Sequence, residues 1–244
     1  MDTVSRFKRD CYSNYLTDLR TAVPSFPRAY TYPDGNPIRP VLPIQKAPAG
    51  VMVIGAFPSA RFESREGRLI PVADNLSPFG PEAYYDGKQV RIQESARALA
   101  EDYLEPLGLL PQKLWITDIV KVYLYPGKHI TNCRELFPRK RLVDTHSMFP
   151  KLAAASRSWF ANEVQACSPK LVITLGEVCA RVVSLDKRSS TKELLDGVVH
   201  QLDAIPDVKV VHLAHPEIRR LHPVWDHRTR AQIQSLGTTL ARFL

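Results

Sequence analysis

Four short apolar segments constrain the fold of this 244-residue chain more than any other feature. They cover residues 51–54, 114–122, 171–175 and 209–213, and they are rich in Val, Ile and Leu. Runs of this length, bounded by Gly, Pro or polar residues, are typical of strands that are buried on both faces of a parallel sheet. Stretches with helical periodicity lie between them. The sequence therefore predicts an α/β fold with three α/β/α layers and a central four-stranded parallel sheet.

The remaining segments suggest how the chain is organised. Helical spacing of apolar residues predicts helices over 4–20, 90–104, 149–167, 176–183 and 232–243. Loops are expected over 56–79 and 124–148. Seven prolines between residues 24 and 48 indicate an extended arm. We therefore expect an N-terminal helix and arm over residues 1–50 and one catalytic domain over 51–244. The arm either covers the flank of that domain or uses Tyr30 and Tyr32 to stack on nucleic acid.

Composition narrows the possible partners and the compartment. Lys and Arg number 33 against 25 Asp and Glu, which gives a formal charge of +8 and favours a polyanionic partner. No apolar run approaches the roughly 18 residues that cross a bilayer, and residues 1–25 lack the apolar core of a secretory leader. We expect a cytoplasmic monomer without membrane contact. The four cysteines are scattered, which predicts reduced thiols and no metal site.

The chemistry is expected at the carboxyl ends of the predicted strands, where open parallel sheets bind ligands. Three residues follow or end such strands: Ala56, Asp118 and His215. The strands are not followed by a G-x-G-x-x-G dinucleotide fingerprint, and the chain has no nucleophile elbow or phosphate loop. These absences disfavour a dinucleotide enzyme and a small-molecule hydrolase or transferase.

Four segments, taken in order, carry a resemblance to a known family. They read G-A-F-P at 55–58, T-D-I-V-K at 117–121, S-P-K-L-V-I-T-L-G at 168–176 and H-L-A-H-P at 212–216. Together they resemble the motifs of the uracil-DNA glycosylase superfamily, and the likeness covers residues 51–244. The resemblance implies an enzyme that flips a nucleotide out of DNA and hydrolyses its N-glycosidic bond, leaving an abasic site. His215 matches the family histidine that hydrogen-bonds the departing base.

The chain also departs from the family pattern. Ala56 and Phe57 occupy the two positions at which family members carry a catalytic carboxylate. One branch carries an aspartate later in the same loop, so Asp74 is the candidate carboxylate, with Asn75 placing water or the base. The alternative is that Asp74 only caps a turn. The cysteines of the iron–sulfur branches have no counterparts, so we expect no cluster and no other cofactor.

Asp118 suggests which base is read. Uracil-reading relatives have asparagine at the matching position, whereas an ionised aspartate can only accept hydrogen bonds. It would favour the exocyclic amine of cytosine. Because removal of plain cytosine would destroy the host genome, we expect a modified cytosine, such as a hydroxymethylated or glucosylated one in phage DNA, and a role in antiviral defence. Alternatively, Asp118 pairs with a nearby cation and reads no base. Ala56, Phe57 and Phe79 complete the predicted base pocket.

The segment after His215 resembles the loop with which the family wedges DNA open, with apolar residues beside cations. It is equally consistent with a solvated helix start. The predicted DNA contacts are Ser59, Lys121, Arg139, Lys140, Arg141, Arg219, Arg220 and His222. Two other functions remain open: a uracil-DNA glycosylase in base excision repair, and a catalytically silent DNA-binding relative.

Overall fold

The computed structural model separates the chain into two compact units, each assembled from three segments. Unit 1 contains Met1–Leu42, Phe57–Gln93 and Ile119–Ala161, and unit 2 contains Pro43–Ala56, Glu94–Asp118 and Asn162–Leu244. This division differs from the expected one at residue 50, because the chain passes back and forth between the units. The structure describes residues 2–45, 48–74, 77–80, 83–85, 88–110, 113–186, 188–202 and 207–240.

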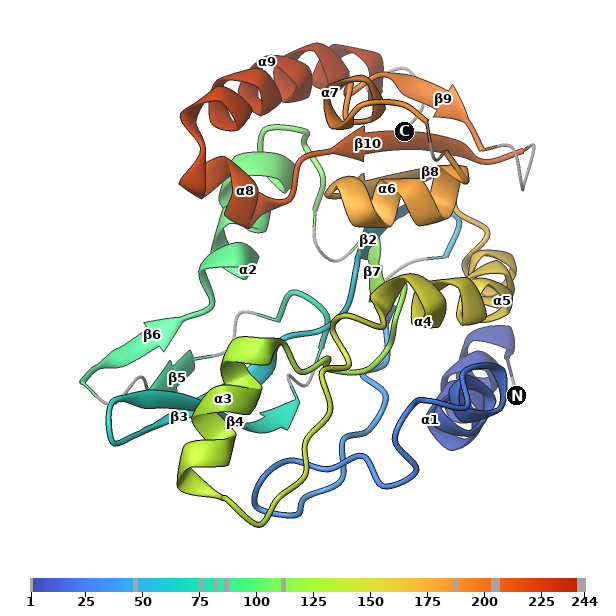
Figure 1. The fold of residues 1–244 in the computed structure, drawn as a ribbon. Coiled ribbons are helices and arrows are strands. Elements are labelled where there is room, and N and C mark those ends of the chain that lie inside the picture. The colour runs from blue at the N-terminus through green and yellow to red at the C-terminus, as the bar shows by residue number, and fades with distance from the viewer. Residues whose placement is uncertain are drawn as a thin grey trace. The chain divides into compact units, whose positions relative to one another are not determined.

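Unit 2 contains a six-stranded, mostly parallel sheet (Figure 1). Its strand order is β1-β7-β2-β8-β10-β9. The parallel centre consists of β2 (Val51–Gly55), β7 (Leu114–Asp118), β8 (Leu171–Leu175) and β10 (Lys209–Leu213). These are the four predicted strands, although β7 ends at Asp118 rather than at residue 122. The predicted strand count is wrong because antiparallel edge strands, β1 (Ile44–Gln45) and β9 (Val199–Gln201), are added.

Burial of apolar side chains stabilises the parallel strands. All residues of β2, β7 and β8 are buried, which explains why the apolar runs were visible in the sequence. The fully buried Trp115 donates from Nε1 to Oε1 of Glu163 at 2.7 Å, so a polar atom inside the core has a partner. Helices flank the sheet.

The helices of unit 2 match the predictions in part. They are α2 (Glu94–Leu99), the π-helix η1 (Ala100–Leu104), α6 (Glu177–Ser184), α7 (Thr191–Leu194), α8 (Pro216–Leu221) and α9 (Pro223–Leu240). The predicted start of a helix at residue 90 is wrong, because Val90–Ile92 forms strand β6 of unit 1 with exposed side chains. The terminal helix begins at Pro223, nine residues before its predicted start, since Pro is well tolerated at the first helical position.

Unit 1 begins with α1 (Thr3–Ala22), close to the predicted helix. Asp2 caps it by accepting from the backbone N–H of Ser5, and four apolar side chains are buried along one face. The proline-rich segment that follows packs into the unit. Tyr30 and Tyr32 are 6% and 2% exposed, and the Tyr30 hydroxyl donates to the carbonyl of Tyr123 at 2.6 Å. Their rings are therefore packed inside the unit and do not form a surface on which bases could stack.

Two expected loops of unit 1 contain regular structure. The 56–79 segment contains a hairpin of β3 (Ala60–Arg65) and β4 (Arg68–Asp74), and the 124–148 segment contains α3 (Gly127–Leu136). The hairpin turns at Glu66 and Gly67, both with positive φ, a conformation that favours glycine. A second hairpin pairs β5 (Ala83–Tyr85) with β6 (Val90–Ile92).

The helix predicted over 149–167 is two helices. They are α4 (Phe149–Ala155) and α5 (Arg157–Cys167), and the residues of α5 fall in both units. Ser156 separates them: its hydroxyl bonds the carbonyl of Leu152 at 2.8 Å and the hydroxyl of Tyr15 at 2.6 Å. Serine back-bonding of this kind bends helices.

No helix within the described ranges is both long and apolar enough to cross a membrane.

Candidate functional site

Three of the predicted site residues follow or end strands of unit 2 at one edge of its sheet. Strands β2 and β7 are parallel, and their last residues, Gly55 and Asp118, are paired in register. Ala56 comes directly after Gly55. Strand β10 ends at Leu213, two residues before His215. Because the four central strands are parallel, their carboxyl ends share one edge, and this edge carries Ala56, Asp118 and His215.

Gly176 and His215 lie in close contact at this edge. Gly176 follows β8, has a φ of 92°, and donates from its backbone N–H to the carbonyl of Leu213 at 2.7 Å. A Cβ at position 176 would lie 3.2 Å from the Cβ of His215. The glycine therefore permits both the backbone turn and the approach of the histidine.

His215 caps helix α8 and has a defined tautomer. Its Nδ1 accepts a hydrogen bond from the backbone N–H of Glu217 at 3.2 Å. Burial lowers the pKa of His215 below its ordinary value, and the nearby Glu217 carboxylate only partly opposes this. The ring is therefore neutral at pH 7. Since Nδ1 accepts, we assign the proton to Nε2, so Nε2 is a hydrogen-bond donor.

Asp118 places a buried carboxylate at this edge. It is 3% exposed, as the last residue of a strand whose other residues are also buried. A buried carboxylate costs several kcal/mol unless its environment or its function compensates. Its position at the carboxyl end of β7 is where a side chain can serve a ligand without disturbing the centre of the sheet.

Asp74 belongs to unit 1, where it is the last residue of β4. The Tyr32 hydroxyl donates to its Oδ1, and the backbone N–H of Arg39 donates to its Oδ2 at 3.1 Å. Burial raises the pKa of Asp74 to about 6, although both hydrogen bonds act in the opposite direction. The side chain is fixed in place and is mostly ionised at pH 7. Both donors, the Tyr32 hydroxyl and the Arg39 backbone N–H, belong to the proline-rich arm.

The cavity beside Asp74 has a volume of about 400 Å³, and all residues that line it belong to unit 1. Tyr12, Tyr32, Asn36 and Arg39 contribute polar groups to it. The Arg39 guanidinium donates to the Tyr12 hydroxyl and lies 5.8 Å from the centre of the Tyr12 ring. Sequence reasoning missed Tyr32 and Arg39 as partners of Asp74, because no local pattern links residues 35 to 42 positions apart.

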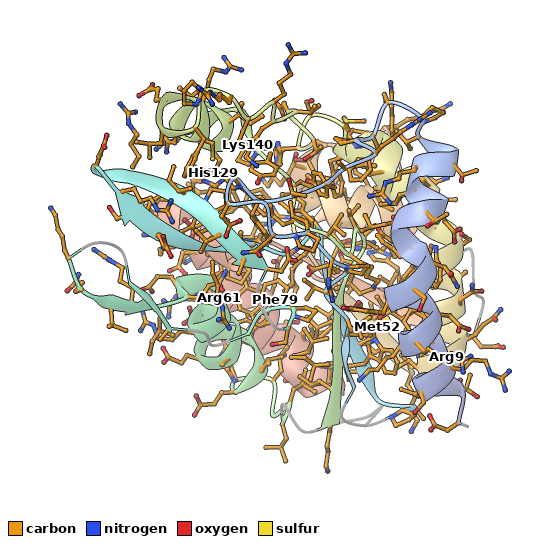
Figure 2. The ribbon with its side chains drawn as sticks, turned by 90° about the horizontal axis from the view of Figure 1, so that it is seen from below. Arg9, Met52, Arg61, Phe79, His129 and Lys140 are labelled. Atoms are coloured by element: carbon orange, nitrogen blue, oxygen red, sulfur yellow. The ribbon has the colours of Figure 1, made fainter. Side chains whose placement is uncertain are left out.

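The other predicted base-pocket residues lie in unit 1. The half-buried Phe57 packs against the rings of His146 and Phe149, with ring centres 5.3 and 5.7 Å apart. Phe79, which Figure 2 labels, is half-buried. Its φ is 49°. Phe57 therefore has aromatic neighbours within its own unit. Asn75 lies outside the described residues.

The predicted DNA contacts differ in exposure. Arg139, Lys140 and Arg141 are exposed in the segment after α3, where Figure 2 labels Lys140. In the described part of the chain none of the three forms an ion pair. We call these three residues the basic stretch. Ser59 is half-buried and accepts from Nε2 of Gln93.

Lys121 and Arg219 do not have the exposure that phosphate contact requires. Lys121 is 1% exposed, and Arg219 is 4% exposed with its Nη2 at 2.6 Å from Oδ1 of Asp226. Burial therefore argues against the predicted DNA contact for both. Arg220 and His222 are exposed, although Arg220 is paired with Glu217 at 2.6 Å.

The cysteines form no cluster. Cys11, Cys133, Cys167 and Cys179 are all buried free thiols. Across the described ranges, no three His, Cys, Asp or Glu residues are grouped so that they could hold a metal ion.

Comparison with known proteins adds no relative: no family model matches the chain, and no curated protein matches it significantly.

Proposed function

We propose that the chain is a DNA glycosylase whose fold is the three-layer α/β/α type of the uracil-DNA glycosylase superfamily. The carrying observation is the shared edge in unit 2, where Ala56, Asp118 and His215 follow or end parallel strands and Gly176 contacts His215. The four segments that resemble the family are far apart in sequence. Residues from all four segments lie at one edge of the sheet. This shared position supports the resemblance more strongly than any single motif does.

The chemistry assigned to these residues follows from their states. Hydrolysis of an N-glycosidic bond leaves an anionic base and passes through a cationic sugar. A neutral histidine that donates from Nε2 is suited to hydrogen-bond the departing base, and His215 has that state. A carboxylate that is ionised near pH 7 is suited to stabilise the sugar and orient water, and Asp74 has that state.

The proposed substrate is a modified cytosine in DNA. When its carboxylate is ionised, Asp118 can only accept hydrogen bonds. It would therefore accept one from the exocyclic amine of cytosine and repel the O4 of uracil. Release of a hydroxymethylated or glucosylated cytosine would act against phage genomes and spare the host. In this proposal the enzyme is a cytoplasmic monomer that needs no cofactor.

Two alternatives give different outcomes. A repair enzyme would release uracil, and a silent relative would bind DNA and release no base. Incubation of the full chain with DNAs containing hydroxymethylcytosine, glucosylated hydroxymethylcytosine or uracil, followed by detection of abasic sites through alkaline strand scission, separates these functions. The proposal predicts scission at the modified positions only. Salt-sensitive binding without scission on any modified DNA would contradict it.

The basic stretch supports a DNA partner and makes a prediction of its own. Replacing Arg139, Lys140 and Arg141 together with Ala should weaken DNA binding by roughly 10- to 100-fold at low salt, because exposed cations without an ion pair are available to phosphates. The dependence of log K on log salt concentration should become shallower by about 2 to 3. Fluorescence anisotropy over a range of salt concentrations measures both quantities.

A matched control removes the same charge elsewhere. Arg9, Arg97 and Arg230 are each paired with a carboxylate in the structure. Their replacement with Ala changes the formal charge by the same three units but should leave the salt dependence close to the parental one. Equal losses in both triple variants would show that net charge, and not the basic stretch, determines the affinity.

A further inference from the structure

A second cavity in unit 2 is lined by residues of α7, β9 and β10 and of the segments beside them, and the proposed glycosylase chemistry does not use it. Figure 1 labels these three elements. Its volume is about 420 Å³, which is in the range of small-molecule sites. Asp186, Glu193 and Asp196 line it together with His200 and His212. Its described lining includes no Lys or Arg, although the chain as a whole has a formal charge of +8.

Local hydrogen bonds lower the pKa of two carboxylates of this cavity, those of Asp186 and Glu193. Hydrogen bonds from Ser189 and from the Arg188 backbone lower the pKa of Asp186 to about 2. Bonds from Ser190 lower the pKa of Glu193. Asp196 accepts from the backbone of Val198 through Oδ1 at 2.9 Å and pairs with His200 through Oδ2 at 2.8 Å. The negative charge of Asp186 and Glu193 is therefore stabilised by local hydrogen bonds and is present at neutral pH.

Arg181 acts on the Asp186 carboxylate through its charge, but its guanidinium has acceptors of its own. The Arg181 Nη2 donates to the backbone carbonyl of Ser189 at 2.9 Å, and its Nε donates to the Glu177 carboxylate at 2.8 Å. Arg181 does not line the cavity.

His212 gives the second, independent observation. Its side chain lines the cavity although the residue is only 3% exposed. Its Nδ1 is bonded to the Thr174 hydroxyl at 2.6 Å, whereas its Nε2 has no hydrogen-bond partner among the described residues. Burial lowers the pKa of His212 to about 4, so the ring is neutral and its Nε2 can accept. This nitrogen is therefore a free acceptor on a side chain that lines the cavity, and a ligand or water can complete it.

We propose that this cavity binds a small aliphatic amine, of the diamine or polyamine class. The carboxylates attract an ammonium group, and Nε2 of His212 accepts one of its hydrogens. An ammonium ligand selects the tautomer in which Nδ1 donates to Thr174 and Nε2 accepts. The apolar side chains of Leu202 and Val210 in the same lining suit the alkyl part of the ligand. A phosphate or other anion is excluded by the three carboxylates.

Putrescine is the probe for the test, and isothermal titration calorimetry with the full chain is the measurement. We expect saturable binding with one site per chain. Asp196→Asn keeps the shape and one acceptor but removes a charge, so the affinity for putrescine should fall by about tenfold. Glu101→Gln is the matched control, because Glu101 is an exposed acid on η1 outside the cavity. The affinity of the Glu101→Gln variant for putrescine should equal that of the parental protein.

A spectroscopic readout separates this site from loose association with acidic surface. In protein labelled with ¹⁵N at histidine, putrescine should shift the ring nitrogen resonances of His212 and leave those of His222 unchanged. Absence of saturable binding, an equal loss of affinity in Glu101→Gln, or an unperturbed His212 would each overturn the proposal. None of these outcomes depends on glycosylase activity.

Discussion

Asp74→Asn should lower the rate of base release by at least about 10²-fold while DNA affinity stays within about twofold of the parental value. The amide is nearly the same size as the carboxylate and can still accept from the Tyr32 hydroxyl. It cannot carry the negative charge that the cationic sugar requires, nor act as a base toward water. Single-turnover kinetics with DNA containing the modified base measure the rate, and anisotropy measures the affinity.

The pH dependence gives the same residue a second test. Because burial raises the pKa of Asp74 to about 6 from its ordinary value of 3.8, the carboxylate form is lost below about pH 6, and the rate should fall there. Tyr32→Phe removes a hydrogen bond that lowers the Asp74 pKa, so the acid limb should move to higher pH. Asp34→Asn is the control, since Asp34 is an exposed acid in unit 1. A parental rate in Asp74→Asn would refute the assignment.

The shift in Asp74 also has a consequence for stability. Between about pH 4 and 6 the folded state keeps the Asp74 proton that the unfolded state has lost, because the folded pKa is the higher one. Stability therefore decreases as pH rises through this window, and the charged carboxylate remains unfavourable for the fold above it. A destabilising group that is nevertheless anchored by two donors is typical of functional sites.

Asp118→Asn should change which base is released. The asparagine amide can donate to the O4 of uracil and accept from its N3–H, whereas the parental carboxylate can only accept. We expect the ratio of rates on uracil and modified cytosine to move toward uracil by at least about 10²-fold, since mismatched polar groups in a closed site are strongly discriminated against. Competition between two labelled duplexes in one reaction measures this ratio directly.

The control for this change is Glu101→Gln, which removes one exposed carboxylate in unit 2. In this control variant, the ratio of the rates on uracil and modified cytosine should equal that of the parental protein. If Asp118→Asn keeps the parental preference and retains its rate, then Asp118 does not read the base. A loss of folding, measured by thermal unfolding, would instead assign Asp118 a structural role, which is the alternative that the sequence left open.

The central strands could be predicted because burial on both faces leaves a continuous apolar run. The edge strand Val199–Gln201 could not be predicted, since it is three residues long and partly exposed. The hairpin containing Asp74 was missed because Pro71 and a register shift between Arg61 and Phe62 interrupt the alternation of a regular strand. Helix α3 was missed because only Ile130 and Cys133 are buried along its ten residues.

The candidate site shows the same limit. Asp118 and His215 could be proposed from the sequence because each occurs in a motif beside a recognisable strand. The arm residues that fix Asp74 could not, because Tyr32 and Asp74 meet only through tertiary packing, 42 residues apart. The exposure of the arginine side chains could not be predicted from the sequence either. Arg219 and Arg220 are adjacent, yet Arg219 is buried against Asp226 and Arg220 lies at the surface.

The most direct test of the central claim is to identify the released base. The purified chain would be incubated with four DNAs that contain uracil, plain cytosine, hydroxymethylcytosine or glucosylated hydroxymethylcytosine, and the free bases would be identified by mass spectrometry. We predict release of a modified cytosine, matched by an equal number of abasic sites, and no release of plain cytosine or uracil. Release of uracil alone would contradict the proposed base specificity, and release of no base from any of the four DNAs would contradict the proposal of a glycosylase for these modified cytosines.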